Sequence, residues 1–335
     1  MAARPPRLPE QGFLYGPVPS RRLGRSLGVD LVPFKTCSYD CVYCQLGRTT
    51  CRTLQRSEYV PTKEVLDAIT AFRRSGAAAD FIGIAGSGEP TLHAGIGEII
   101  AGIRKRTRLP VAVLTNGSLL WDAAVRRELS GAQVVIPSLD AGGPRTFRRV
   151  NRPHPRLAFE TVVEGLTAFA AGFRGELWLE VMVVAGINTD RHEVRRIARL
   201  AERIGPRRIQ LNTVVRPPAE RFARPVPRED LERLARCLGG NAECIADFRP
   251  DAETATPRGR ARERAILELL ARRPCTVSGI AAGLAIHPQE TVKRLDDLLR
   301  RGLIAVNERD GERYFGLKRI RTPRVRSHLP ERSLP

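Results

Sequence analysis

Short apolar runs alternate with amphipathic stretches between residues 27 and 215, and this alternation constrains the fold more than any other feature of the chain. Most of the runs are rich in β-branched residues and apolar on both faces, as parallel strands are when helices cover both sides of their sheet. The strands are expected at 27–32, 80–85, 111–115, 133–137, 177–184 and 207–214. The helices are expected at 63–74, 95–106, 119–129, 158–170 and 191–204. Such units predict an α/β fold with right-handed crossovers, built as a partial (β/α)6 parallel barrel. A doubly wound open sheet is the rival fold, but no G-x-G-x-x-G sequence opens a helix.

The composition and the apolar pattern of the sequence change after the barrel region. Residues 216–256 are rich in proline and arginine, with one helix expected at 228–238. Further on, the pattern predicts helices at 261–272, from a cap at Thr276 or Ser278 to 284, and at 288–301, then strands at 303–307 and 313–317 around an Asp310-Gly311 turn. Three helices followed by a hairpin are typical of a winged helix-turn-helix. The expected domains are the barrel at 12–215, a closing strand, connector and linker at 216–256, the winged helix-turn-helix at 257–318 and a disordered basic tail at 319–335.

The chain is basic, with a net charge of +20. The excess is denser toward the C-terminus, because residues 257–335 hold 18 basic and 9 acidic residues. A basic helical module is a candidate for binding nucleic acid. No apolar run reaches the ~18 residues that a membrane helix needs, and the first residues lack the apolar stretch of a secretory signal. We therefore expect a cytoplasmic protein with no membrane partner, in a compartment where thiols stay reduced.

Three cysteines stand close together in a C-x3-C-x2-C spacing, at Cys37, Cys41 and Cys44. Three thiolates on one short loop can hold three corners of a cubane iron–sulfur cluster, which leaves the fourth iron open to a small molecule. A structural zinc site usually needs four ligands, and Cys51 or His93 would complete it only at an irregular spacing. Ferredoxin-type runs add a fourth cysteine followed by proline, which this segment lacks. The spacing therefore favours a cluster with an open corner over zinc.

The other four cysteines are Cys51, Cys237, Cys244 and Cys275. Seven cysteines is an odd number for a chain of 335 residues, and it does not indicate a disulfide framework. The four are also too scattered for a second cluster. We expect them to be small buried apolar side chains.

Two motifs together resemble the signature of the radical S-adenosylmethionine (radical SAM) enzymes. The first is the cysteine segment with an aromatic residue, Tyr43, before its third cysteine, and the second is the sequence GSGEP at 86–90, after the second expected strand. The run from Tyr15 to Asp30 is similar to a branch of Fe–S oxidoreductases related to the wyosine-forming tRNA enzymes. The resemblance implies a [4Fe–4S] cluster on the three cysteines and S-adenosylmethionine (SAM) on its open iron. An electron from the cluster would break a sulfur–carbon bond of SAM and give a 5′-deoxyadenosyl radical.

The resemblance also assigns roles to residues at the ends of the expected strands. Tyr43 would border the adenine of SAM. Backbone carbonyls of the GSG turn would approach the ammonium group of SAM with the charge of Glu89 beside them, the turn being Gly86, Ser87 and Gly88. Polar residues at the next two strand ends would contact the ribose and carboxylate of SAM, namely Thr115, Asn116, Ser138 and Asp140. The alternative for these four is turn and helix-cap chemistry alone.

Further polar residues fall where a substrate would lie, in or after the later strands: Glu180, Asn188, Asn212 and Arg216. Arg21, Arg22 and Arg25 precede the cysteines and could bind an anionic substrate or cover the base of the barrel. We therefore expect a radical SAM enzyme of the Fe–S oxidoreductase type, with an external electron donor and an unidentified substrate. Two alternatives stay open. One is an iron–sulfur transcription regulator that reads DNA through 288–301 with Gln289, Lys293, Arg294 and Arg300, and the other is a radical SAM enzyme that modifies tRNA or another RNA.

Overall fold

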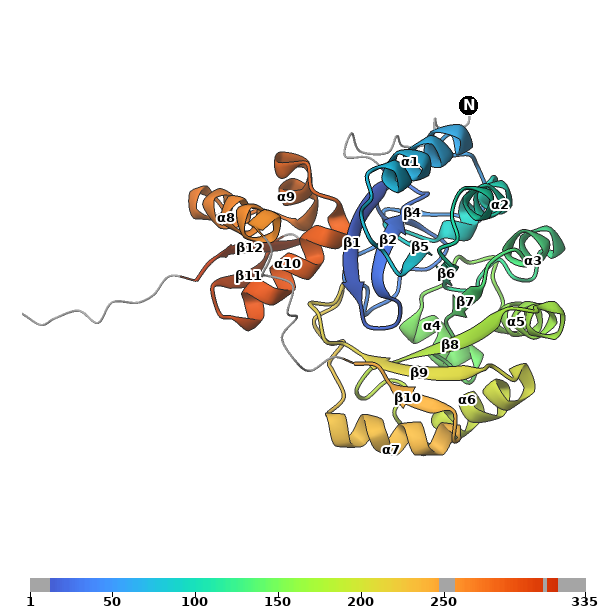
Figure 1. The fold of residues 1–335 in the computed structure, drawn as a ribbon. Helices are drawn as coiled ribbons and strands as arrows, with labels where there is room; N and C mark the ends of the chain where they lie inside the picture. The colour runs from blue at the N-terminus through green and yellow to red at the C-terminus, as the bar shows by residue number, and fades with distance from the viewer. Residues whose placement is uncertain (1–12, 247–256, 310–311, 319–335) are drawn as a thin grey trace, which may run out of the picture.

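The computed structural model describes residues 13–246, 257–309 and 312–318. Its centre is an eight-stranded sheet with the strand order β1-β2-β5-β6-β7-β8-β9-β10. Neighbouring strands from β2 to β10 are parallel, and β1 is antiparallel to β2. The strands are β1 (Leu14–Ser20), β2 (Gly24–Val29), β5 (Phe81–Ile84), β6 (Val111–Thr115), β7 (Val134–Pro137), β8 (Glu176–Val183), β9 (Arg208–Thr213) and β10 (Ala242–Cys244). Figure 1 shows the sheet curving into a partial barrel, as the alternating pattern predicts.

Helices surround the outer face of the curved sheet (Figure 1). They are α1 (Thr62–Arg74), α2 (Ile96–Arg106), α3 (Ala123–Leu129), α5 (Phe159–Gly172), α6 (Arg191–Ile204) and α7 (Arg228–Leu238). The short helix α4 (Pro144–Val150) lies next to the cysteine loop, where the amide of Val42 donates to the carbonyl oxygen of Val150 at 2.9 Å. A short 3-10 turn, η1 (Pro90–Leu92), follows β5. Helix α6 shows how local sequence sets the ends of the helices. The side chain of Asp190 caps its first turn by accepting from two backbone amides, and Gly205 ends it with a φ of 65°. The apolar side chains of α6 are buried on one face, against the sheet and its neighbours.

All six predicted barrel strands are present, and β10 lies within 216–256, where a closing strand is expected without exact bounds. Among the described residues, sequence analysis misses the edge strand β1 and the short pair β3 (Thr36–Cys37) and β4 (Cys51–Arg52). Strand β1 contains Gly16 and Pro17, residues that disfavour strands except at an edge. Strand β10 is three residues long and only half-buried, so the sequence does not give the exact bounds of the closing strand. Helix α3 begins at Ala123 instead of 119, because Asp122 caps it by accepting from the amide of Ala124 at 2.8 Å.

Residues 257–318, which we call the C-terminal module, form three helices and a hairpin. These are α8 (Pro257–Arg272), α9 (Val277–Leu284), α10 (Pro288–Arg300) and the antiparallel pair β11 (Ile304–Arg309) and β12 (Glu312–Leu317). Thr276 caps α9, with its hydroxyl oxygen accepting from the amide of Gly279 at 3.0 Å. The order of elements agrees with the prediction, although α8 begins at Pro257 and not at 261. The predicted Asp310-Gly311 turn, the tail at 319–335 and part of the predicted linker, 247–256, lie outside the described residues.

The C-terminal module packs against the barrel beside β1 (Figure 1). Nε2 of His287 lies 2.9 Å from the carboxylate of Asp30, just after β2, and the imidazole ring stacks on Tyr15 with centroids 4.0 Å apart. Leu46, from the loop that carries the cysteines, is buried in the apolar core of the module. Arg313 of β12 donates to the carbonyl oxygen of the neighbouring residue, Gln45, at 3.0 Å. The module and the cysteine loop therefore share one packed interface.

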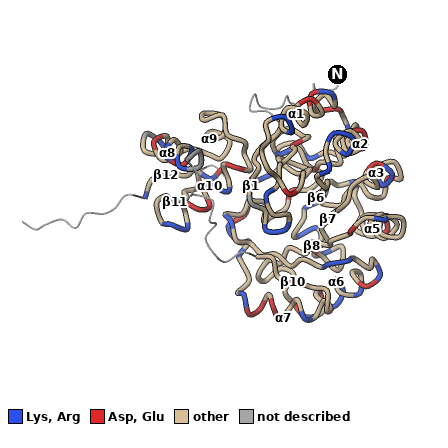
Figure 2. The backbone as a smooth tube through the Cα atoms, in the orientation of Figure 1, with Lys and Arg blue, Asp and Glu red and all other residues tan. Residues whose placement is uncertain are grey.

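Charged residues of both signs are interspersed along the outer helices and in the C-terminal module (Figure 2). Several form pairs one helical turn apart, such as Arg228 with Glu232 and Arg264 with Glu268, each at 2.8 Å. In the part of the chain that the structure describes, no helix has the length and apolar character of a membrane span.

Candidate active site

The three predicted cluster cysteines lie on a loop that follows β2 at the carboxyl edge of the sheet. The backbone amide of Lys35 donates to the carbonyl oxygen of Ser87 at 2.7 Å, which fixes the loop to the turn after β5. Lys35 has a φ of 61°, in the left-handed region that residues other than glycine rarely adopt. Beyond it, β3 pairs in parallel with β4, and the amide of Cys44 donates to the carbonyl of Cys41 at 3.1 Å. Backbone hydrogen bonds on both sides thus define the conformation of the loop.

Each cysteine sulfur has an N–H donor from a different part of the chain. Measured to Sγ, the three pairs are Asn116 with Cys37 at 3.5 Å, Asn151 with Cys41 at 3.6 Å and Lys35 with Cys44 at 3.1 Å. Such donors stabilise sulfur that carries negative charge. In iron–sulfur proteins they also help to set the reduction potential.

Burial is the main cause of the raised pKa values of Cys37 and Cys41. It raises the pKa of Cys37 to about 12, and the nearby charge of Glu89 adds to the effect. The pKa of Cys41 is also raised, first by burial and then by the charge of Asp140. Both groups are therefore thiols at neutral pH unless a cation compensates the thiolate charge. Binding of iron would displace these protons, as metal binding does at cysteine sites in general.

The donor set fits a cluster better than a single metal ion. Within residues 13–246, 257–309 and 312–318, no three His, Cys, Asp or Glu side chains come together closely enough to hold one ion. A zinc site gathers four ligands around one centre, whereas a cubane cluster binds each thiolate through a separate iron. Cys51, the nearest further thiol in the sequence, is not among the residues that line the cavity shared by the other three. Three cysteines line the described cavity, which is the number of protein ligands that a cubane cluster with one open iron needs.

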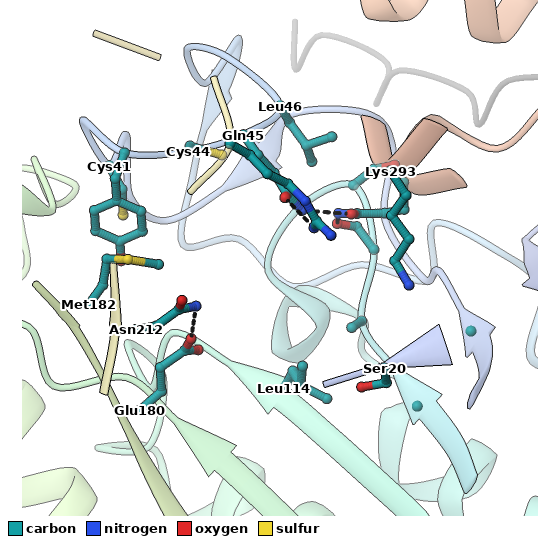
Figure 3. A pocket seen from close by; sticks show the side chains of 18 of the residues that line it. Ser20, Cys41, Cys44, Gln45, Leu46, Leu114, Glu180, Met182, Asn212 and Lys293 are labelled. Atoms are coloured by element: carbon teal, nitrogen blue, oxygen red, sulfur yellow. Dashed lines mark hydrogen bonds between the residues drawn. The ribbon is translucent and has the colours of Figure 1, made fainter. Parts of the chain in front are cut away.

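The three cysteines line a cavity of about 570 Å³ at the mouth of the barrel. Figure 3 shows Cys41 and Cys44 on one side of it, Glu180 and Asn212 across the space, and Lys293 entering from α10. Apolar side chains complete much of the wall: Val18, Leu23, Leu46, Leu114, Met182, Val214 and Val215. A cavity of this size, with an apolar wall and a few polar groups, can hold a small organic molecule beside the sulfurs.

The turn after β5 reaches the cavity with the three predicted residues Gly86, Ser87 and Gly88. A Cβ on Gly88 would lie 1.7 Å from the carbonyl oxygen of Thr36, so this turn touches the cysteine loop through its backbone. A Cβ on Gly86 would lie 2.1 Å from the carboxyl carbon of Asp30. Close packing within the protein therefore requires both glycines, and it also brings the backbone of the turn to the cavity.

Glu89 is 2% exposed and is not among the described residues that line the cavity. Its carboxylate accepts from the amide and hydroxyl of Thr91 at 3.0 and 2.6 Å, from the hydroxyl of Thr115 at 2.6 Å and from the amide of Asn116 at 2.7 Å. Burial raises the pKa of Glu89, and these hydrogen bonds oppose the rise. The carboxylate of Glu89 therefore lies behind the turn formed by Gly86, Ser87 and Gly88. It joins the ends of β5 and β6.

The four residues expected to contact the ribose and carboxylate of SAM are also absent from the described wall of the cavity: Thr115, Asn116, Ser138 and Asp140. Thr115 and Asn116 support Glu89, and Asn116 also supports Cys37. Ser138 forms a backbone bridge with Glu180. These contacts join the ends of neighbouring strands to each other and to the cysteine loop.

Asp140 is buried, with 3% of its surface exposed, and its carboxylate accepts hydrogen bonds from three separate parts of the chain. Its carboxylate accepts from the side-chain amide of Asn151 at 2.6 Å, from the backbone amide of Met182 at 2.9 Å and from the hydroxyl of Tyr43. Burial raises the pKa of Asp140 to about 6, and these donors limit the rise. Tyr43 itself lines the cavity, as expected, so Asp140 orients a residue of the site from behind.

A series of hydrogen bonds joins α10 to the cysteine loop, and we call it the Gln45 network. Nε2 of Gln289 donates to the carbonyl oxygen of Gly86 at 2.7 Å, and Nε2 of Gln45 donates to Oε1 of Gln289 at 2.9 Å. Arg216 donates to Oε1 of Gln45 at 2.9 Å and to the carboxylate of Asp296 at 3.3 Å. Sequence analysis does not identify Gln45 as a site residue, because its contact with Gln289 spans 244 positions.

Further wall residues were predicted on the substrate side: Glu180, Asn212, Arg216, Arg21 and Arg22. Two others do not reach the cavity. Asn188 is buried and bonds to backbone groups, including the carbonyl of Asp140 at 2.8 Å, and the exposed Arg25 lies 3.7 Å from Asp80. Lys35 also lines the cavity and was not predicted as a site residue. Lys293, named from the sequence only as a DNA contact in the regulator alternative, lines the cavity as well.

Comparison with known proteins places these features in a family. The family model of the radical SAM superfamily matches residues 31–201. A UPF0026 protein of Helicobacter pylori is 32% identical over 300 residues, which cover 88% of this chain and 94% of that protein. A Brachyspira hyodysenteriae protein named GTPase Obg is 36% identical over 291 residues, 86% of this chain, but the chain spans only 42% of its length. A solved radical SAM methyltransferase from Sphaerobacter thermophilus superposes with a TM-score of 0.50 at 18% identity over 67% of each chain, a likeness of fold.

Proposed function

Because the chain belongs to the radical SAM superfamily, we propose that this enzyme holds a [4Fe–4S] cluster on Cys37, Cys41 and Cys44 and cleaves SAM reductively. Members of the superfamily bind this cluster and SAM. Held by Cys37, Cys41 and Cys44, the cluster would supply the electron for reductive cleavage of a sulfur–carbon bond of SAM, and the radical chemistry that follows would act on a substrate. The substrate is unidentified, and an external donor supplies the electron.

The observation that carries this proposal is the environment of the three sulfurs. They line one cavity at the carboxyl edge of the barrel, where α/β barrels place their active sites. Each has an N–H donor behind it. Glu180, the one carboxylate of the described wall, lies across the cavity from Cys41 and Cys44 and is paired with Arg22. The protein can thus hold a cluster from three corners while the fourth faces open space.

We propose that two groups of residues serve the bound SAM in different ways. Tyr43 and the turn formed by Gly86, Ser87 and Gly88 border the cavity and are the proposed contacts. Behind them lie Glu89, Thr115, Asn116, Ser138 and Asp140, which we propose as positioning residues. Their hydrogen bonds fix the strand ends and the aromatic ring that face the ligand.

We propose that the C-terminal module is a winged helix-turn-helix that forms part of the wall of the active site. Its helix α10, which a DNA-binding protein of this type would insert into the major groove, contributes Gln289 and Lys293 to the cavity. Arg294 and Arg300 pair with acidic residues of the same helix. These contacts favour an enzyme over a regulator that reads DNA through α10, and they give no specific support for an RNA substrate. We place the enzyme in the cytoplasm, where its thiols stay reduced.

The test is anaerobic reconstitution of the full chain with iron and sulfide, reduction with dithionite in the presence of SAM, and detection of 5′-deoxyadenosine by chromatography. We expect a brown protein that releases this nucleoside. Cys41→Ala should abolish the release, whereas Cys237→Ser, at an exposed cysteine of α7, should retain it. Unchanged release from Cys41→Ala, or a colourless protein that holds stoichiometric zinc, would overturn the proposal.

A further inference from the structure

Basic side chains outnumber acidic ones in the wall of the cavity. Among the described wall residues, the cations are Arg21, Arg22, Lys35, Arg216 and Lys293, and Glu180 is the one carboxylate. The negative charge of Glu180 is neutralised by Arg22, which forms an ion pair with it. Lys35 lies beside the sulfur of Cys44 and belongs to the cluster site. Arg216 forms an ion pair with Asp296 at 3.3 Å, and Asp296 also pairs with Arg300 at 3.3 Å, so two guanidinium groups share this one carboxylate. The described wall as a whole still holds more basic than acidic side chains.

Arg216 and Lys293 come from different parts of the chain but lie in the same region of the cavity. Gln289 and Lys293 are four residues apart on α10, and residues at this spacing share one face of a helix. Arg216 is bonded to this face through Gln45, which contacts Gln289, and through Asp296, which is three residues beyond Lys293. The barrel and the C-terminal module thus each contribute one cation to a shared region of the wall.

The chemistry of these two side chains suits an anionic ligand. A guanidinium group has five N–H donors, and the contacts of Arg216 with Gln45 and Asp296 engage two of its nitrogens. Lys293 adds a compact charge with three donors at the end of a flexible stem. Arg216 and Lys293 are both half-buried. Solvent and salt therefore screen their attraction to an anion less than they would on an open surface.

We propose that Arg216 and Lys293 form a subsite that binds a carboxylate or phosphate group of the substrate. The proposal deepens the proposed function, since it assigns a substrate class to the same cavity: a small molecule with at least one anionic group. It also gives the C-terminal module a specific role, because the module supplies half of the subsite.

The test measures binding and not turnover, so it stays informative if SAM cleavage is never observed. Inorganic phosphate and succinate are titrated separately into the reconstituted full chain, without reductant, by isothermal calorimetry. The variants are Lys293→Gln, which removes the charge, and Lys293→Arg, which keeps it. Lys105→Gln, at an exposed position of α2, is the control for a general loss of positive charge.

We expect saturable binding of at least one anion, about tenfold or more weaker in Lys293→Gln, and close to the original in Lys293→Arg and Lys105→Gln. Preference for phosphate or for succinate would then identify the anionic group. Three results would overturn the proposal. They are no saturable binding by the unmodified protein up to about 10 mM, equal affinity in Lys293→Gln, and full displacement of the anion by S-adenosylhomocysteine, which would assign the subsite to SAM.

Discussion

Gln289 of α10 donates its side-chain amide to the carbonyl oxygen of Gly86 at 2.7 Å, across 203 positions of the sequence. The acceptor belongs to the turn that packs on the cysteine loop, and the donor belongs to the C-terminal module. A single hydrogen bond therefore joins the module to the turn proposed to contact SAM. The site is a product of both parts of the chain, and a description of the barrel alone would leave it incomplete.

The contact between His287 and Asp30 should hold the module on the barrel. Both side chains are buried, and His287→Ala would remove the contact at 2.9 Å together with the stacking on Tyr15, while the amide of Ser87 would still donate to the carboxylate. We expect the free energy of unfolding to fall by about 1–3 kcal/mol, measured by denaturant titration. His192→Ala, at an exposed position of α6, is the matched control and should change it little. Equal losses in the two variants would contradict the assigned contact.

Gly88→Ala should disrupt the cysteine loop. The added Cβ would lie 1.7 Å from the carbonyl oxygen of Thr36, a distance that only movement of the backbone can relieve. We expect a large loss of stability, with less iron bound per chain after reconstitution. Gly172→Ala, at the end of α5, meets no atom within 4 Å and should leave both quantities unchanged. If Gly88→Ala bound iron normally, the close packing of turn and loop would be wrong.

Lys35→Gln should make the cluster harder to reduce. Nζ of Lys35 lies 3.1 Å from Sγ of Cys44, and its positive charge favours the reduced, more negative cluster. We expect the reduction potential to become more negative, on the order of tens of millivolts, because net charge and hydrogen bonds to sulfur both set this potential. The measurement is a redox titration followed by electron paramagnetic resonance. Lys105→Gln removes the same charge at a distant surface position; an equal shift there would remove the specific role of Lys35.

Asp140 predicts a definite dependence of stability on pH. Burial raises its pKa to about 6 in the folded protein, against about 3.9 in an unfolded chain. A raised carboxyl pKa means that the folded state binds the proton more tightly than the unfolded state. The contribution of Asp140 to the free energy of unfolding is therefore greatest below pH 4 and falls as the pH rises to 6. The difference corresponds to roughly 3 kcal/mol.

The measurement is the unfolding free energy of the unmodified protein minus that of Asp140→Asn, at the same cluster content and at several pH values. Asparagine cannot ionise, so the difference isolates this one carboxyl from the other titrating groups. We expect the difference to decrease between about pH 4 and pH 7. A difference that is constant over this range, or one that increases, would show that burial does not control the ionisation of Asp140.

Sequence analysis predicts the barrel strands and the cysteine loop because both depend on local patterns. The period of apolar residues identifies strands and helices one at a time, and the spacing of three cysteines is complete within eight positions, 37–44. The order of strands then follows from the right-handed crossover. This is why the position of the turn at Gly86, after β5, could be predicted.

The roles of single side chains were harder to predict, because they depend on long-range packing. Glu89 lies at the expected strand end, yet its carboxylate accepts from Thr115 and Asn116, which the neighbouring strand β6 brings to it. Only the pairing of the strands determines whether such a group faces a cavity or the protein interior. The positions of Gln289 and Lys293 in the cavity wall could not be predicted for the same reason. Their helix is recognisable from sequence, but the face that meets the barrel is set by tertiary contacts such as that of His287 with Asp30.

Leu46 stands two residues after the third cysteine, yet its side chain is buried among residues of the C-terminal module, including Phe315 near the end of the described chain. During synthesis on the ribosome, the cysteine loop emerges long before those residues exist. At that stage the side chain of Leu46 has no apolar core to pack into. We therefore expect iron and sulfide to be inserted stably only after the C-terminal module has been synthesised, so that strands made late govern the maturation of a loop made much earlier.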